Sequence, residues 1–301
     1  MKKVFTILIM LALPLVLMAQ GAGGEIRRPV RTNTNSNAQN SSATNNQRNN
    51  NANAQTNNKG SNAKPAAQAA TRSRDAILQD LINNMVRVEG GTFMMGATSE
   101  QGSDAYSDEK PVHQVTLSSF SIGKYEVTQE EWEAVMGSNP SEFKGAKRPV
   151  ENVSWNDCQA FIRKLKELTG RNFRLPTEAE WEFAARGGTK SIGYKYAGGD
   201  NLESVAWYNY NSGRTTHEVG QKAPNELGLY DMSGNLTEWC SDWYDKYTSS
   251  TQTNPTGPSS GSSRVYRGGT WKLYAKACRV SYRHESIPSS QYDDLGFRLA
   301  L

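Results

Sequence analysis

The sequence has little cysteine, little histidine and little excess charge. Only three cysteines and three histidines occur in 301 residues. Three cysteines are too few for a disulfide-rich scaffold, and in an oxidising compartment they would give one pair and one spare thiol. The formal net charge is only +4 and no run of basic residues occurs, whereas nucleic-acid-binding domains carry strong basic patches. We therefore expect no nucleic-acid partner.

Large apolar side chains are missing from residues 33–63, a stretch dominated by Asn with Gln, Ser and Thr. Such a stretch cannot bury enough surface to offset the entropy that folding removes. We expect residues 20–71 to form a disordered, Asn-rich linker that serves as a spacer.

The first 19 residues are typical of a secretory signal peptide. Lys2 and Lys3 precede an apolar run from Val4 to Met18. This run is short and contains Pro14, which favours a cleaved signal over a membrane anchor. We expect an exported protein, periplasmic or at the cell surface, without a transmembrane segment in the mature chain.

The remaining sequence has the patterns of a short helix followed by one domain. Residues 72–85 carry apolar side chains at helical spacing, which predicts a lead-in helix packed against the domain at 86–301. Within that domain, MVRVEGGTFMMG (85–96) alternates like one strand that ends in a glycine turn. HQVTLSSFSIGKYEVT (113–128) resembles two short strands.

Capping motifs predict three further helices. Each helix should begin with a hydroxyl residue and an acidic residue three positions later, and end near a glycine. The three pairs are Thr128 with Glu131, Ser154 with Asp157, and Thr177 with Glu180, and the expected ends are Gly137, Gly170 and Gly187. Cys158 lies early in the second helix, where we expect a buried structural thiol.

The C-terminal stretch, residues 264–301, has little periodicity but ends on the apolar run LGFRLAL. It contains a glycine pair, one cysteine, five arginines and two consecutive aspartates. These features predict a long ordered loop that returns to a core strand, and ordered loops on rigid scaffolds often carry sites. Its charged residues could form a salt-bridge network or a polar ligand-binding floor. They are Arg267, Arg279, Arg283, Arg298, Glu285, Asp293 and Asp294.

Several motifs occur in an order that resembles the formylglycine-generating enzyme (sulfatase-modifying factor) family. The matching segments, from Met85 to the end of the chain, are MVRVEGGTFMMG, KYEVTQEEW, PVENVSWNDCQAF, RLPTEAEWEFAARGG, NELGLYDMSGNLTEWCSDWY, RVYRGGTW and DDLGFRLAL. The resemblance implies an irregular α+β domain with a C-type-lectin-like core and little regular secondary structure. The short predicted helices and strands agree with that fold.

The oxidases of this family use two cysteines, spaced C-x-x-x-x-C after the RGG turn, which bind copper and oxidise a sulfatase cysteine. By position, Cys278 matches the second cysteine and Leu273 stands at the first. Leucine has no ligand atom and no redox chemistry, so the two-thiol site is absent and we expect no copper. Cys240 could lie near Cys278, which leaves a structural disulfide, two buried free thiols, or an atypical redox or metal pair as alternatives.

The resemblance also implies a calcium site. The matching ligands are the side chains of Asp231 and Glu238 and the carbonyls of Gly234 and Leu236, a hard oxygen set that suits Ca²⁺. Alternatively, the two carboxylates cap local backbone amides. The family's second calcium site needs an Asn and an Asp where this chain has Val205 and His217, so we expect that site to be lost.

These observations favour an exported, non-oxidase binding or structural module of the cell envelope. The expected binding surface lies around Trp271, Tyr274, Tyr282 and Arg283 and would take a protein, peptide or glycan. One alternative is a formylglycine-generating oxidase that works through Cys278, with or without Cys240. Another is a lectin-like ligand-display protein.

Overall fold

The computed structural model describes residues 72–301, which lie in one compact unit that starts at Ala66. The signal peptide expected at 1–19 and the linker expected at 20–71 lie outside the described residues. Among the helices of residues 72–301, none is long and apolar enough to cross a membrane.

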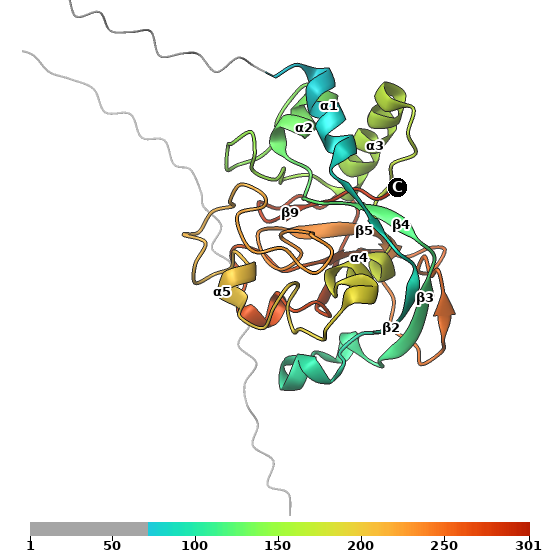
Figure 1. Ribbon diagram of the computed structural model, residues 1–301. Coiled ribbons are helices and arrows are strands. Elements are labelled where there is room, and N and C mark those ends of the chain that lie inside the picture. Colours follow the sequence, from blue (N-terminus) through green and yellow to red (C-terminus); the bar gives the residue numbers. More distant parts are fainter. Residues whose placement is uncertain (1–71) are drawn as a thin grey trace, which may run out of the picture. The chain divides into compact units, whose positions relative to one another are not determined.

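Helices and strands in the described part are short and separated by long loops (Figure 1). The helices are α1 (Arg74–Asn83), α2 (Gln129–Met136), α3 (Trp155–Thr169), α4 (Glu178–Ala185) and α5 (Leu202–Val205), with 3₁₀ turns η1 (Ser99–Asp104), η2 (Ser107–Glu109), η3 (Gly188–Lys190) and η4 (Ala275–Ala277). The strands are β1 (Met85–Val88), β2 (Gly91–Met95), β3 (His113–Leu117), β4 (Phe120–Gly123), β5 (Thr237–Trp243), β6 (Gln252–Thr253), β7 (Arg264–Arg267), β8 (Arg283–Ser286) and β9 (Leu295–Gly296).

The strands of residues 72–301 form three small sheets, in the orders β1-β4, β2-β3-β6 and β8-β7-β5-β9. The single strand expected over 85–96 is wrong, because β1 and β2 belong to different sheets. The chain changes sheet at Gly90, where a Cβ atom would lie 2.4 Å from the carbonyl oxygen of Leu117. Only glycine allows the backbone to pass there.

The three capped helices are confirmed. In α2, α3 and α4 the hydroxyl and acidic residues form the expected reciprocal capping boxes, and Gly137 and Gly170 end α2 and α3 in the left-handed conformation. The lead-in helix is present as α1, which packs on α2 (Figure 1). Helices α1, α2 and α3 enclose one hydrophobic core, which contains Cys158 and the closing residues Leu295, Phe297 and Leu299.

A second hydrophobic core surrounds α4, whose eight residues are all buried. It is contributed by β1 to β5 and β7, and includes Trp181, Phe183 and Cys240. The last residues return to this centre: β9 pairs with β5, and Ala300 bridges to Arg174 and Ile122. The mixed, irregular architecture confirms the α+β fold of the C-type-lectin-like type. The C-terminal loop, residues 264–301, is therefore supported by the rigid centre of the domain.

Candidate functional site

The C-terminal loop is shaped by a tight turn at Gly268 and Gly269. Both residues have positive φ, at 107° and 74°. A Cβ atom at Gly269 would lie 2.6 Å from the carbonyl oxygen of Ala277, so η4 packs directly on the turn. After the turn, the Trp271 amide donates to the carbonyl of Asn235. This arrangement fixes the positions of Leu273 and Cys278.

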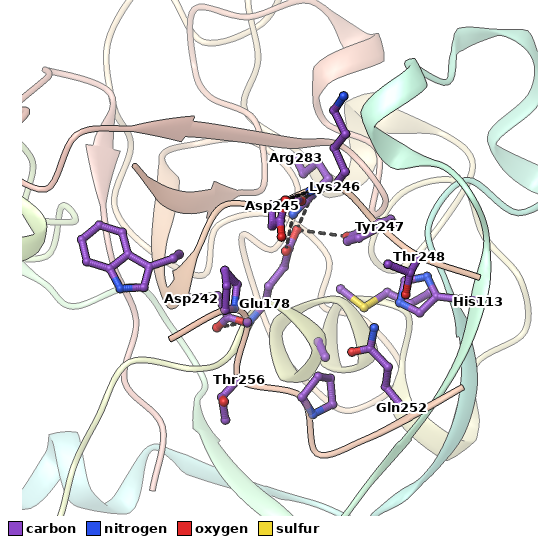
Figure 2. A pocket seen from close by; sticks show the side chains of 16 residues that line it. His113, Glu178, Asp242, Asp245, Lys246, Tyr247, Thr248, Gln252, Thr256 and Arg283 are labelled. Atoms are coloured by element: carbon purple, nitrogen blue, oxygen red, sulfur yellow. Dashed lines mark hydrogen bonds and ion pairs between the residues drawn. The ribbon is translucent and has the colours of Figure 1, made fainter. Parts of the chain in front are cut away.

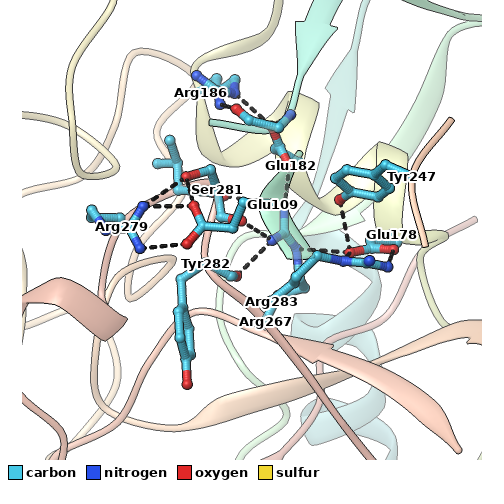
Figure 3. Close-up of polar contacts among 12 residues, drawn as sticks. Glu109, Glu178, Glu182, Arg186, Tyr247, Arg267, Arg279, Ser281, Tyr282 and Arg283 are labelled. Carbon is cyan, nitrogen blue, oxygen red and sulfur yellow. Dashed lines mark hydrogen bonds and ion pairs between the residues drawn. The ribbon is translucent and has the colours of Figure 1, made fainter. Parts of the chain in front are cut away.

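Buried arginine–glutamate pairs hold the C-terminal loop in place (Figure 3). Arg279 binds Glu109 of η2 through two nitrogens at 2.6 and 2.5 Å. The other pairs are Arg267 with Glu182, Arg283 with Glu178, and Arg298 with Glu238. The predicted salt-bridge network of these arginines is thus confirmed, but the acidic residues predicted to pair with them are wrong. The acids come instead from η2, α4 and β5.

Asp293 and Asp294, which were expected to pair with these arginines, lie instead against Lys272, at 2.6 and 3.0 Å. Lys272 lies three residues after Gly269, so this half-exposed contact ties the segment after the glycine turn to the end of the loop. The two aspartates therefore form ion pairs near the surface, and the arginines form theirs in the interior.

All three cysteines of the chain are buried and free. Cys240 belongs to the core around α4, whereas Cys278 packs in a separate cluster with Tyr196 and Tyr208. The disulfide considered for these two residues is not formed. Burial raises the pKa of Cys278 to about 12 and that of Cys240 far above its usual value. Reactive cysteines need a lowered pKa, and neither thiol has the surroundings that provide one.

Leu273, at the position of the missing cysteine, is half-buried and lines a small pocket of about 160 Å³. The pocket is lined by Thr237, Tyr266, Leu273, Tyr282, His284, Tyr292 and Asp294. The Leu273 carbonyl accepts a hydrogen bond from the Asn209 amide at 3.0 Å. The Leu273 side chain is apolar, lies beside aromatic rings in this pocket and offers no ligand atom for a metal.

Three tyrosines, Tyr266, Tyr282 and Tyr292, line this pocket with Leu273. We call them, together with His284, Tyr106, Tyr210 and Tyr274, the tyrosine surface. Tyr274 contacts Tyr210, with ring centroids 6.0 Å apart, and both are exposed. Tyr106 contacts Tyr282 at 5.8 Å, and the Lys276 ammonium lies 5.0 Å from the Tyr106 ring. Such rings present large contact areas with few rotatable bonds.

The four residues predicted to bind a partner differ from one another in burial and position. Tyr274 is exposed and Tyr282 is half-buried, and both belong to the tyrosine surface. Trp271 is buried against Phe143 and donates from Nε1 to the Asp293 carbonyl, so it supports the surface from below. Arg283 is buried in its ion pair with Glu178 and lines a different cavity. The structure does not bring Arg283 together with the other three.

The predicted calcium ligands lie in a buried carboxylate cluster that also includes Glu126. Glu238 accepts hydrogen bonds from Arg298 and from the Trp181 indole, so a cationic partner already faces it. Asp231 accepts from the Gly220 amide through one oxygen, while its Oδ1 is buried without a partner. No group of three or more acidic, histidine or cysteine side chains in residues 72–301 is arranged to hold a metal.

The carboxylate cluster carries more negative than positive charge. Burial first, and then the neighbouring carboxylates, raise the pKa of Glu126 well above its usual range. Burial likewise raises the pKa of Asp231 to about 6, with Glu238 adding to the shift. Asp231 Oδ1 is therefore a buried carboxylate oxygen that stays open to a hard cation such as Ca²⁺, whereas Glu238 is paired with Arg298.

Sequence reasoning missed Glu109, Tyr106 and Tyr210. Glu109 and Tyr106 lie in the irregular segment around η2, and Tyr210 lies in the loop after α5. No periodicity marks these segments, and the contact of Glu109 with Arg279 of the C-terminal loop spans 170 residues. For Tyr210 alone the sequence contains a signal. Tyr208 and Tyr210 lie on either side of Asn209, and two tyrosines so close together are unusual in a solvated turn.

Comparisons with known proteins agree with this geometry. The sulfatase-modifying factor enzyme 1-like domain matches residues 71–301. A "chaperone protein LppX" of Paenibacillus barcinonensis is 37% identical, covering 72% of this chain and 89% of its own. The formylglycine-generating enzyme of Streptomyces coelicolor is 32% identical, covering 79% of this chain and 95% of its own.

Among solved structures, a "Treponema denticola variable protein 1" is similar with a TM-score of 0.65 and 39% identity. The match covers 72% of this chain and 94% of that one. The fold, the glycine turn and the family match all indicate the same family. The chain belongs to the sulfatase-modifying factor enzyme 1-like family.

Proposed function

We propose that the protein is an exported, non-oxidase member of its family that binds a partner protein through the tyrosine surface. The observation that carries the proposal is Leu273, which stands where the oxidases have their first cysteine and packs among tyrosines. The raised pKa of the Cys278 thiol, caused by burial, supports the same conclusion.

The composition of the tyrosine surface supports a protein partner. Tyr210 and Tyr274 have exposed fractions of 75% and 57%, which is high for aromatic side chains. Exposed tyrosines held on a rigid base are typical of interface anchors. One relative is named a chaperone protein, and chaperones act by binding other proteins. The signal expected at residues 1–19 would place this surface in the periplasm or outside the cell.

The proposal is tested by binding the full-length protein to arrays of peptides and of glycans. We expect peptide ligands whose binding falls about tenfold or more in the double variant Tyr210→Ser/Tyr274→Ser. Ile192→Ser is the control, because it removes another exposed apolar side chain outside this surface. Ligands that bind the double variant as well as the wild type would overturn the assignment, and glycan-only binding would favour the ligand-display alternative.

We also propose that Asp231 binds a calcium ion together with the carbonyls of Gly234 and Leu236. The unpartnered, buried Oδ1 of Asp231 supports this site. A bound cation would balance the excess negative charge of the cluster and so stabilise the loop between Tyr230 and Glu238. Calcium here would be structural, since it lies in the domain interior beneath the glycine turn.

Thermal unfolding tests the calcium site. We expect CaCl₂ to raise the melting temperature by about 5 °C, because a ligand that binds only the folded state stabilises it. MgCl₂ should have a smaller effect, since Mg²⁺ loses its waters reluctantly. Asp231→Asn should abolish the shift, and the exposed Glu285→Gln should retain it. An equal shift in Asp231→Asn would contradict the site.

A further inference from the structure

A second cavity, of about 350 Å³, lies outside the tyrosine surface (Figure 2). Its base is the start of α4 with the end of β5, and the loop from Asp245 to Pro258 forms its rim. The volume is within the range of small-ligand sites. Among its lining residues are Asp242, Asp245, His113, Lys246 and Thr256, which are labelled in Figure 2.

Asp242 is 4% exposed and keeps one acceptor oxygen without a partner among residues 72–301. Its Oδ2 accepts from the Glu178 amide at 3.0 Å and from the Ser241 hydroxyl at 2.9 Å. Within residues 72–301, no donor is paired with Oδ1. Gly257 keeps this oxygen open, because a Cβ atom there would lie 3.3 Å from it. A buried carboxylate with a free oxygen at a cavity wall invites a hydrogen-bond donor.

His113, which is also buried, provides a second acceptor on the other side of the cavity (Figure 2). Its Nδ1 lies 3.1 Å from the Pro111 carbonyl, and a carbonyl can only accept, so Nδ1 carries the hydrogen. Nε2 of the neutral ring is then an acceptor. The ring is held edge-on against Tyr247, with centroids 4.8 Å apart. The cavity thus presents two acceptors and needs a ligand with donors.

The charges around the cavity cancel, except at Asp242. Glu178 is paired with Arg283 at 2.6 Å. Asp245 and Lys246 at the rim are exposed and of opposite sign, and Lys246 extends away from Asp242 in Figure 2. No ion pair to Asp242 is formed within the described part of the chain. A cationic donor would supply the missing partner.

A sugar fits this cavity less well than a cation. Sugars usually need an open aromatic face, and the Trp243 ring in the wall is covered by the Arg264 guanidinium, which lies 3.5 Å from the ring centroid. Arg264 also donates to the Ser241 carbonyl and so is held in place. The Tyr247 ring, which also lines the cavity, is covered by the Arg283 guanidinium, 4.0 Å from its centroid. The open groups of the cavity are therefore its acceptors.

We propose that this cavity binds a guanidinium or alkylammonium group, with Asp242 as its counter-ion and His113 as a second acceptor. The cation could be a free small molecule or the basic side chain of a partner protein. Both sources present the same N–H donors to Asp242. The site is independent of the proposed tyrosine surface, so each can fail without the other.

Calorimetric titration of the full-length protein with arginine and with citrulline tests the charge requirement. Citrulline has the same shape as arginine but is neutral, so we expect saturable binding of arginine only. Asp242→Asn should weaken that binding by about 10-fold to 100-fold, the range for a hydrogen bond to a charged group. Asp245→Asn, which removes a charge from the exposed rim, should change it less than about twofold.

Two further measurements keep the test decisive. Thr256→Trp changes an exposed rim residue and should block the cavity even if Asp242→Asn disturbs folding.

The pH dependence of binding is the second measurement. Burial, with Glu178 and Glu180 of α4 adding to it, raises the pKa of Asp242 to about 7, and Arg264 of β7 is the nearby cation. Affinity should therefore rise between about pH 6 and about pH 8, as the carboxyl ionises.

A third ligand, an acetylated and amidated Ala-Arg-Ala peptide, distinguishes the two sources of the cation. Binding of free arginine but not of the peptide assigns a small molecule, and tighter binding of the peptide assigns a partner's side chain. The proposal is overturned if neither binds more tightly than citrulline, or if Asp242→Asn and Thr256→Trp both bind arginine like the wild type.

Discussion

Position 273 is a leucine, where the resemblance places the first cysteine of the family's oxidases. The glycine turn before Leu273 and η4 after it are both present. The side chain is the difference, since a thiolate at this position would complete a two-cysteine site. Cys278 alone is buried, and burial holds its thiol protonated at neutral pH.

Thiol counting tests the state of the cysteines. We expect an aromatic disulfide reagent to label essentially no cysteine in the native protein, because Cys158, Cys240 and Cys278 are all buried. In denaturant without reductant, all three should react. A count of one thiol per chain would show that Cys240 and Cys278 are bonded after all. Protein purified with an irreversible alkylating agent present is the control against oxidation during handling.

At the scale of elements, helices were easier to predict than the C-terminal loop. The capping boxes of α2, α3 and α4 depend on residues three positions apart, so the sequence alone predicted their starts. The partners of the loop arginines depend on tertiary packing. Glu109 and Arg279 are 170 residues apart, and no local pattern could join them.

The pair of Glu109 with Arg279 anchors η2 to the C-terminal loop, and its removal should be severe. Glu109→Gln leaves a buried guanidinium without its counter-ion, so we expect a loss of about 3–5 kcal/mol in the free energy of unfolding. Chemical denaturation measures this loss. The double variant Glu109→Gln/Arg279→Met should recover much of it, because no charge is then left unpaired.

The exposed pair of Asp104 with Lys195 serves as the control for that measurement. Its side chains are 47% and 25% exposed, and Asp104→Asn should change stability by less than about 1 kcal/mol. Equal effects of Asp104→Asn and Glu109→Gln would mean that the buried pair does not anchor the loop.

The candidate site was only partly predictable, because tertiary packing brings some of its residues together from distant parts of the sequence. The motif order pointed to the glycine turn, Leu273, Tyr274 and Tyr282, which are close in sequence. Tyr106 and Tyr210 reach the same surface from distant loops, and only the fold brings them there. The cavity at Asp242 was not predicted, because its residues come from β3, α4, β5 and the loop after β5.

At the scale of the whole molecule, the domain keeps the architecture of its family without the two thiols of the oxidases. Two hydrophobic cores, the buried arginine–glutamate pairs and the glycine turn together support the C-terminal loop. That support is independent of the side chain at 273. The same scaffold can therefore present an oxidase site or, as we propose here, a surface for a partner.

The central claim is that this scaffold lacks formylglycine-generating activity. The direct measurement is conversion of cysteine to formylglycine in a peptide that carries a sulfatase motif, with copper added, followed by mass spectrometry. The Streptomyces coelicolor enzyme serves as the positive control. We predict that the wild type forms no more product than Cys278→Ala. Turnover by the wild type that disappears in Cys278→Ala would contradict the account.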